Sequence, residues 1–89
     1  MINLHWLKTF CTLADIGHFT KTADVLFMTQ SGVSQHIKKL EQQLAVTLLL
    51  REGKSFTLSD EGLRLYQQGK LLLEKSDDLA QSIKQDDAH

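Results

Sequence analysis

The stretch TQSGVSQHIKKLEQQL, residues 29–44, decides the fold of this chain. Its apolar residues recur at steps of four, three and four, the spacing of one helical face: Val33, Ile37, Leu40 and Leu44. At about 100° per residue, the opposite face carries short polar groups and then bases: Ser31, Ser34, Gln35, Lys38, Lys39 and Gln42. A helix that only has to be soluble usually fills this face with long charged side chains. The short groups indicate a helix end that comes very close to another molecule.

The length and composition are those of one small folded unit. Eighty-nine residues make a small domain, or a small domain followed by a long helix. Such a unit buries only about 60% of its unfolded surface, so a partner chain would help its stability. The hydrophobic share of 42% and charged share of 24% exclude a disordered tail. The sequence contains neither an apolar run long enough to span a membrane nor a secretory signal. The single cysteine, Cys11, favours a reducing compartment. We therefore expect a cytoplasmic protein without membrane contact.

Charge is unevenly distributed along the chain. The net charge of −1 argues against a generally basic nucleic-acid binder. Residues 17–58, however, carry five bases against three acids, a balance of +2, whereas residues 59–89 carry four bases against seven acids, a balance of −3. The middle of the chain could therefore face a polyanion while the C-terminal part faces away.

Two helices are predicted before residue 29. An apolar stripe predicts a first helix that ends at Gly17, namely Leu4, Leu7, Cys11 and Ala14, with Phe10 beside it. Thr20 is a suitable N-cap for a short second helix over residues 21–26. The residues of this second helix that we expect to face the core are Ala23, Leu26 and Phe27. With Thr29 capping the next helix, the pair forms a helix-turn-helix.

A hairpin and a long helix are predicted after residue 44. Residues 45–47 leave the helix, and two β-prone runs, 48–51 and 55–58, flank a turn at Gly53. Ser59 would cap a last helix, with acidic residues in its first turn. No proline interrupts the chain from there, so about 27 residues of helix would extend roughly 40 Å.

The last helix carries an apolar stripe that a small domain cannot cover. We therefore expect another chain, or a further domain, to bury it. Gly62 and Gly69 would allow a close approach of the two backbones there, although glycine costs a helix about 1 kcal/mol. The predicted dimer interface comprises Leu65, Tyr66, Gly69, Leu72, Leu73, Leu79, Ala80 and Ile83.

This order of elements resembles the N-terminal DNA-binding region of LysR-type transcriptional regulators. The match is carried by FCTLADIGHFTKTADVLFMTQSGVSQHIKKLEQQLAVTLLLR, residues 10–51, followed by TLSDEG, residues 57–62, and the resemblance covers essentially the whole chain. Four residues depart from the family pattern: Ser31 and Gly32 replace the usual Pro and Ala, Ala45 a glycine, and Leu49 a phenylalanine.

The resemblance implies a mainly α fold. Residues 1–58 would form a winged helix-turn-helix of three helices and a two-stranded hairpin wing, with the helix-turn-helix at about 19–38. Residues 59–89 would form the linker helix for dimerisation. Proteins of this family continue into a larger domain that binds a small-molecule effector, so we expect this chain to end just after the linker helix. No cofactor is implied.

The residues predicted to contact double-stranded DNA are Thr20, Lys21, Gln30, Ser31, Ser34, Gln35, Lys38, Arg51 and Lys54. Gln30 and Ser31 would lie in the first helical turn, whose N–H groups favour a phosphate, and glutamine can pair with adenine. One turn later, Ser34 and Gln35 are expected to contact bases or phosphates. Lys38 is expected to contact a phosphate. The alternative is ordinary capping and a solvated surface.

The wing and the second helix would contribute further contacts. Arg51 is expected in a narrow minor groove or on its phosphates. For Lys54 this interpretation and a merely solvated charge both stay open. Thr20 and Lys21 could anchor a phosphate at a helix N-terminus, although simple capping explains Thr20 nearly as well.

The remaining reactive residues suggest no chemistry. Cys11 falls on an apolar stripe and is expected in the core, and Trp6 is expected to be partly buried. The four histidines share no metal-ligand spacing and are expected at the surface or in loops: His5, His18, His36 and His89. No catalytic constellation is present, so the sequence predicts no enzyme.

The sequence therefore predicts a regulator that binds an interrupted inverted repeat as a dimer through its linker helices. A higher oligomer of a full-length protein stays open. The alternative is a protein-interaction module with a coiled-coil arm. Such a module should show large apolar anchors on the outer face of residues 30–38, where this chain has Ser, Gly, Gln and Lys.

Overall fold

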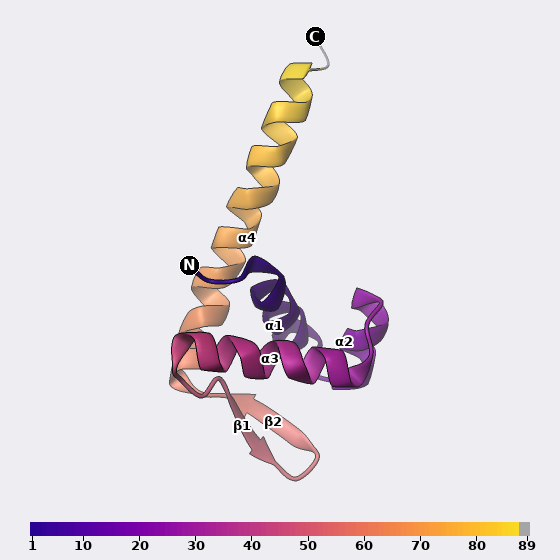
Figure 1. Ribbon diagram of the computed structural model, residues 1–89, viewed down its shortest axis with the longest axis vertical. Helices are drawn as coiled ribbons and strands as arrows, with labels where there is room; N and C mark the ends of the chain where they lie inside the picture. Colours follow the sequence, from indigo (N-terminus) through magenta and orange to yellow (C-terminus); the bar gives the residue numbers. More distant parts are fainter. Residues whose placement is uncertain (88–89) are drawn as a thin grey trace.

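The structure, a computed structural model, describes residues 1–87. In this part of the chain four helices and a two-stranded hairpin follow one another in the predicted order, so the mainly α winged helix-turn-helix fold is confirmed (Figure 1). The elements are α1 (Leu4–Ile16), α2 (Phe19–Leu26), α3 (Gln30–Leu44), β1 (Leu49–Glu52), β2 (Ser55–Leu58) and α4 (Asp60–Asp87).

Helices α1, α2 and α3 form the compact part of the molecule, which we call the head, and α1 lies at its centre. Helix α1 begins where the side chain of Asn3 accepts a hydrogen bond from the backbone N–H of Trp6 (3.0 Å), and it ends at Gly17, whose φ of 82° is left-handed. Its contacts with α2, α3 and α4 bury most of its length. The core consists of Leu7, Phe10, Cys11, Leu13, Ala23, Val33, Ile37, Leu40, Leu48 and Leu49.

Helix α2 begins earlier than the sequence predicted. Its first residue is Phe19, and His18 takes the N-cap position without a side-chain hydrogen bond. The prediction that Thr20 is the N-cap is therefore wrong, because Thr20 already lies in the first turn. Phe19 is half-buried against Phe56 of the hairpin, and this distant contact accompanies the earlier start of the helix.

The turn between α2 and α3 closes on a left-handed residue that is not glycine. Phe27 has φ 55°, and its N–H donates to Asp24 O while the N–H of Met28 donates to Ala23 O. The Phe27 side chain is 97% exposed, so its predicted place in the core is wrong. Thr29 caps α3 as predicted, because its hydroxyl accepts from the backbone N–H of Gly32 (2.9 Å).

The hairpin, or wing, is fastened to the head at its base. Strands β1 and β2 are antiparallel, with Arg51 opposite Phe56. Where the chain enters the wing, the Glu41 carboxylate accepts from the backbone N–H of Leu48 (2.8 Å). Where it leaves, the Ser59 hydroxyl accepts from the N–H of Gly62 and so caps α4, as the sequence predicted.

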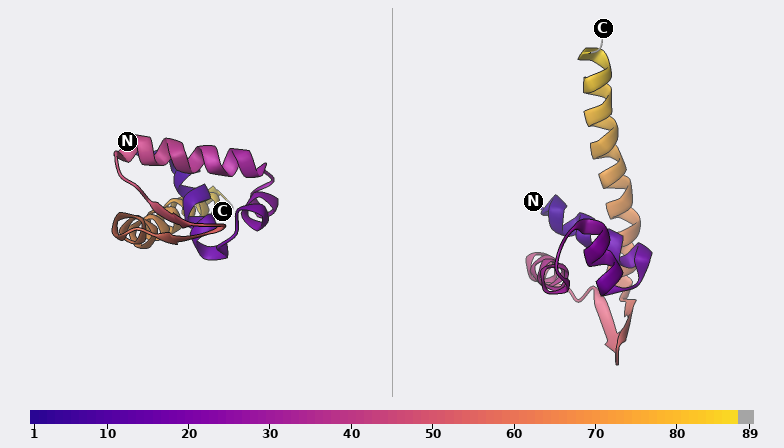
Figure 2. Two further views of the ribbon diagram at one scale, coloured as in Figure 1. Left: turned by 90° about the horizontal axis from the view of Figure 1, so that it is seen from below. Right: turned by 90° about the vertical axis from the view of Figure 1, so that its right-hand side faces the viewer.

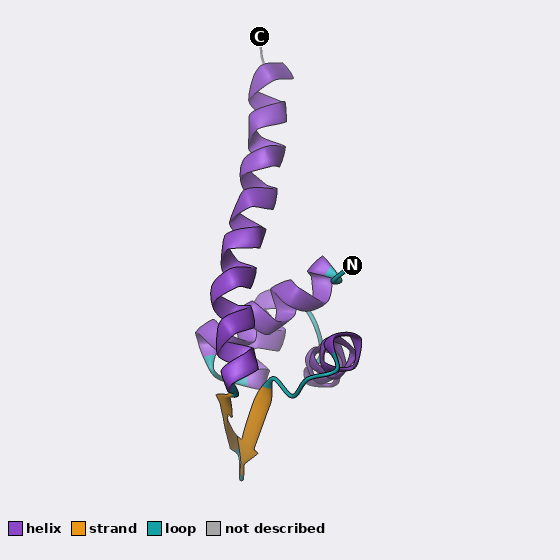
Figure 3. Cartoon of the chain, turned by 90° about the vertical axis from the view of Figure 1, so that its left-hand side faces the viewer, coloured by secondary structure: helices purple, strands orange, loops and turns teal. Residues whose placement is uncertain are grey.

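Helix α4 projects from the head on the side opposite the wing, and the molecule is 54 × 25 × 18 Å (Figures 1 and 3). Up to Leu73 it packs partly against the core, and the described side chains from Glu74 to Lys84 are all exposed. None of the helices in residues 1–87 is long and apolar enough to cross a membrane.

Both glycines of α4 lie against their own chain. A Cβ at Gly69 would lie 2.8 Å from Leu7 Cδ1 and 3.2 Å from Cys11 Sγ, and one at Gly62 would collide with the carbonyl oxygen of Leu48. We expected the two glycines to allow an approach between two chains. The close approaches in the structure are instead to α1 and to the base of the wing.

Candidate nucleic-acid interface

The first turns of α2 and α3 and the wing meet at one end of the molecule, away from α4. Seen from below, α3 runs beside the wing while α4 is viewed nearly end-on behind them (Figure 2, left). Two adjoining surface hollows lie among these elements. Seven of the nine predicted DNA contacts line them: Thr20, Lys21, Gln30, Ser31, Ser34, Arg51 and Lys54.

Phe19 is one residue of this region that the sequence did not identify as part of the site. It lines both hollows, and its ring meets that of Phe56 edge to face, with centroids 5.6 Å apart and an interplanar angle of 71°. The Arg51 guanidinium carbon lies 4.9 Å from the Phe19 centroid on the same side of the wing as Phe56. The cation of Arg51 is thus placed by an aromatic support beside the start of α3.

A hydrogen bond joins the first turns of α2 and α3. The Gln30 side-chain amide donates to the Thr20 hydroxyl, and both residues are exposed. The bond orients Gln30 toward the start of α2 and ties the two helices at the surface that they share. Thr20, which is not the cap of α2, acts here as an acceptor.

The next turn of α3 continues this surface. Ser31 and Gln35 are exposed and Ser34 is half-buried, so a row of short polar groups lies along the outer face of α3. Val33 and Ile37 on the opposite face are buried in the core, as the spacing of residues 29–44 predicted. The outer face of α3 therefore begins with groups that can donate and accept hydrogen bonds at close range.

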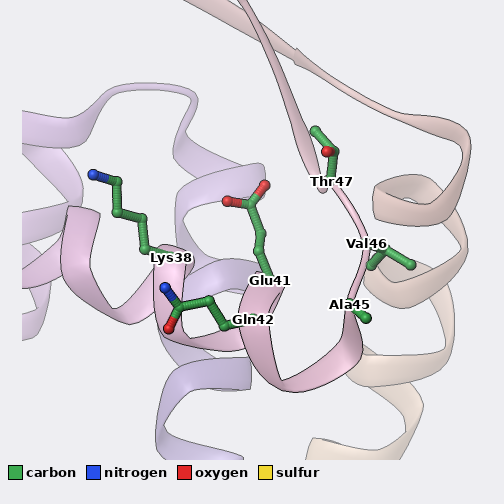
Figure 4. Close-up of a pocket in the computed structure, with 6 residues that line it drawn as sticks. All are labelled: Lys38, Glu41, Gln42, Ala45, Val46 and Thr47. Carbon is green, nitrogen blue, oxygen red and sulfur yellow. The ribbon is translucent and has the colours of Figure 1, made fainter.

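Lys38 belongs to a different hollow, near the C-terminal end of α3. That hollow is lined by Lys38, Glu41, Gln42, Ala45, Val46 and Thr47 (Figure 4). The Lys38 side chain points away from Glu41, whose carboxylate is turned toward the segment that leads into β1. Lys38 is exposed and can reach a partner beside α3. It does not line either of the two hollows that Phe19 lines.

His36 lies on the side of α3 that faces away from Lys38, and it contacts helix α1. His36 is half-buried, and its Nδ1 lies 2.8 Å from the Thr9 hydroxyl of α1. Burial, and then the nearby positive charges of Lys39 and His5, lower the pKa of His36 below its ordinary value. The expectation of a surface or loop position is wrong for His36, whereas His5 and His18 are exposed and His89 lies outside the described residues.

Trp6 and Cys11 are placed as the sequence predicted. Trp6 is half-buried, with Lys39 Nζ 5.9 Å from its ring centroid. Cys11 is buried, and burial together with the charge of Asp15 raises the pKa of its thiol to about 11. Among the side chains that the structure describes, residues 1–84, no three His, Cys, Asp or Glu side chains gather closely enough to hold a metal ion.

The residues predicted for a dimer interface divide into two groups. Leu65, Tyr66 and Leu73 are half-buried against the head, and Gly69 is buried there. The others are exposed, and Leu71, which the sequence did not single out, is exposed with them. At 100° per residue the exposed residues Leu72, Leu79, Ala80 and Ile83 lie on one side of the helix, and we call them the distal face of α4, whereas Leu71 lies opposite Ala80.

Comparison with protein families gives one clear match. The profile described as "Bacterial regulatory helix-turn-helix protein, lysR family" matches residues 4–63. Two similar proteins of Bacillus subtilis are an uncharacterized HTH-type transcriptional regulator, YxjO, 38% identical over 79 residues, and the HTH-type transcriptional regulator CitR, 43% identical over 61 residues. The alignments cover 78% and 68% of this chain, but only 27% and 21% of those proteins.

Solved structures of similar fold include two protein–DNA complexes. The chain in the BenM_DBD complex with benA site 1 DNA has a TM-score of 0.88 and 31% identity, and the match covers 93% of each chain. For the BenM_DBD complex with catB site 1 DNA the TM-score is 0.87 and the identity 32%, with 92% of this chain and 88% of the other covered.

Proposed function

Because this chain belongs to the lysR family of bacterial regulatory helix-turn-helix proteins, we propose that it binds duplex DNA as a dimer at an interrupted inverted repeat. Proteins of this family are transcriptional regulators and not enzymes, which confirms that part of the sequence prediction. The chain spans about a quarter of the length of these relatives. We therefore propose a regulator whose effector would bind in a further, larger domain and which acts in the cytoplasm, where the bacterial chromosome lies.

The observation that carries the proposal is the meeting of three elements at one end of the molecule. The starts of α2 and α3 bring helix N-termini, which favour phosphate, and the wing brings Arg51 and Lys54. Short polar side chains lie between them on α3. Support also comes from the two BenM complexes, in which a chain of this fold is bound to DNA.

Each element would have its own role on the duplex. The outer face of α3 would enter the major groove, where Gln30, Ser34 and Gln35 read base edges. Thr20, Lys21 and Lys38 would bind phosphates, which fix register but carry no sequence information. Ser31 would serve either role, and Arg51 with Lys54 would follow the minor groove or its phosphates.

The dimer would be formed by residues 59–89, while residues 1–58 bind DNA. The distal face of α4 is apolar, exposed and far from the wing, so a second copy of α4 can cover it without blocking α3. Gly69 is no longer part of the proposed interface, because α1 fills the space beside it. The α3 helices of two copies joined in this way would bind half-sites roughly 34 Å apart.

Selection of bound sequences from a random duplex pool, followed by gel-shift titrations of variants, tests the proposal. A consensus with two-fold symmetry is expected. Gln35→Ala should then weaken the selected site far more than random duplex. Lys38→Ala should weaken both alike and reduce the slope of log affinity against log salt by about one. Gln42→Ala, a change on the same helix beside Lys38, is the control and should alter neither.

Three results would count against the proposal. If Gln35→Ala and Lys38→Ala act alike on both duplexes, the division between base and phosphate contacts is wrong. A consensus without symmetry contradicts the dimer on DNA. Failure to bind any duplex at low salt would favour the alternative, a protein-interaction module with a coiled-coil arm.

A further inference from the structure

The direction of α4 is fixed within its first half alone. Side chains of α4 pack against the head up to Leu73, and from Glu74 to Lys84 the described side chains are exposed. From Lys70 to Asp87, the end of the helix, the rise of 1.5 Å per residue gives about 25 Å. A small change of angle near Lys70 is therefore enlarged at the far end.

The close contact between α1 and α4 allows the two helices to approach without fixing their angle. At Gly69 the backbone of α4 comes against Leu7 and Cys11, and a Cβ there would lie 2.8 Å from Leu7 Cδ1. A glycine beside two apolar side chains offers no directional bond. Rotation about this crossing has to be limited by contacts on either side of it.

Such a contact lies beside the crossing and joins the end of α1 to α4. The Tyr66 hydroxyl donates to Asp15 Oδ1, and Lys70 Nζ lies 3.2 and 3.3 Å from the two carboxylate oxygens of Asp15. Lys70 Nζ also lies 5.3 Å from the Tyr66 ring centroid. Tyr66 and Lys70 are four residues apart, so they present neighbouring positions of one helical face to a single carboxylate. We call these three residues the Asp15 clamp.

Asp15 is poorly placed for α1 itself. It lies in the last turn of a helix that ends at Ile16, where the helix dipole disfavours negative charge, and that turn contains no basic residue. The partners on α4 account for the position. With 42% of each side chain exposed, the Lys70–Asp15 pair adds little to stability. Its hydrogen bonds are directional, however, unlike the apolar contacts at Gly69.

We propose that Asp15, acting through Tyr66 and Lys70, is a positioning residue that sets the angle of α4 and thereby the spacing of half-sites that the dimer accepts. The inference rests on the proposed dimer. A rotation of about 10° at the crossing moves the far end of α4 by roughly 4 Å. That displacement exceeds the ~3.4 Å between successive base pairs, so the clamp would select among spacer lengths.

The first test measures the helix angle without DNA. Spin labels are attached at His5→Cys on α1 and Ser82→Cys on α4, both exposed positions, while the native Cys11 is buried. Labelled chains are diluted with unlabelled ones so that distances within one chain dominate. Asp15→Ala should broaden the distance distribution. Asp24→Ala, which removes an exposed aspartate from the last turn of α2, should leave it unchanged.

The second test measures spacing on DNA. Copies of the selected operator are made with one or two base pairs added to or removed from the spacer. The unsubstituted protein should prefer one spacing by at least about tenfold, and Asp15→Ala should reduce the preference to about threefold or less, with half-site affinity and thermal midpoint nearly unchanged. Asp15→Asn, which keeps an oxygen for Tyr66, should give an intermediate preference.

The outcomes separate the two proposals. If the unsubstituted protein prefers one spacing and Asp15→Ala keeps that preference, or if the label distances do not broaden, the role of Asp15 is overturned while the dimer stands. If the unsubstituted protein shows no spacing preference, the proposed dimer on DNA fails, and the spacing role of Asp15 is overturned with it.

Discussion

The guanidinium carbon of Arg51 lies 4.9 Å from the centre of the Phe19 ring, so the wing and the first turn of α2 are held as one surface. The ring of Phe56, which lies opposite Arg51 on the hairpin, also meets the Phe19 ring, with centroids 5.6 Å apart. The position of a proposed DNA contact thus depends on a residue that need not touch DNA.

Phe19→Leu should therefore affect both stability and DNA binding. Loss of the aromatic pair and of the cation–π contact, each about 0.5–1.5 kcal/mol, should lower the free energy of unfolding by about 1–2 kcal/mol in a denaturant titration. Affinity for the selected operator should fall by about tenfold, because Arg51 loses its support. Phe27→Leu, at an aromatic residue that is 97% exposed, should change either quantity little. Equal effects of the two variants would contradict this role of Phe19.

Three glycine-to-alanine substitutions in helices should change the free energy of unfolding in different directions. A Cβ at Gly32 would lie 3.2 Å from the capping hydroxyl of Thr29 and 3.3 Å from the flexible end of Met28. Both neighbours are side chains that can shift by a few tenths of an ångström, so Gly32→Ala should raise the free energy of unfolding by about 0.5 kcal/mol through helix propensity. Gly62→Ala would meet the backbone carbonyl of Leu48, which cannot turn away, and should lower it by about 2–3 kcal/mol. Gly69→Ala, against the side chain of Leu7, should lie between them. Denaturant titrations giving one sign for all three would refute this ordering.

Acidification should destabilise the fold through His36. The pKa of His36 is lowered in the folded chain by burial first, and then by Lys39 and His5. The unfolded chain therefore binds this proton more readily, and stability is lost as the pH falls below the ordinary histidine value of 6.5. Thermal midpoints should decrease between about pH 7.5 and 5.5, and His36→Gln should show a smaller decrease. An unchanged profile in His36→Gln would exclude this source of the pH dependence.

The joint between α3 and the wing should depend on an acceptor at position 41. Glu41→Ala leaves the Leu48 N–H without its partner and should lower the free energy of unfolding by about 1–3 kcal/mol. Glu41→Gln keeps a side-chain oxygen and should lose less. Gln42→Ala, in the same hollow but without this bond, is the control (Figure 4). If Glu41→Ala proves as stable as Gln42→Ala in chemical denaturation, the bond does not hold the wing.

The sequence predicted the elements whose signals are local. The spacing of Val33, Ile37 and Leu40 gave the buried face of α3, and Thr29 and Ser59 were identified as caps from their position before a helix. The turn at Gly53 was expected between two β-prone runs, and its φ is 62°. Each of these features depends on residues within one or two turns of each other.

What the sequence missed depends on contacts between distant segments. The start of α2 was misplaced at Thr20, and the contact of its first residue, Phe19, with Phe56 of the hairpin could not be read from local spacing. Phe27 was assigned to the core because neither spacing nor composition shows that its backbone is left-handed. Helical spacing put Gly69 and Tyr66 on one side of α4, but it could not show that α1 lies there. Seven predicted site residues are nevertheless together, since α2, α3 and the wing have the expected order.

The two ends of this elongated molecule differ in electrical sign. The segment that holds α3 and the wing carries +2, the segment that holds α4 carries −3, and the long axis measures 54 Å. Dissolved salt at physiological strength damps an electric field within about 8 Å, so a polyanion near the wing senses little of the acidic tail. A polyanion at the wing is therefore attracted mainly by the +2 of residues 17–58, although the total charge of the chain is −1.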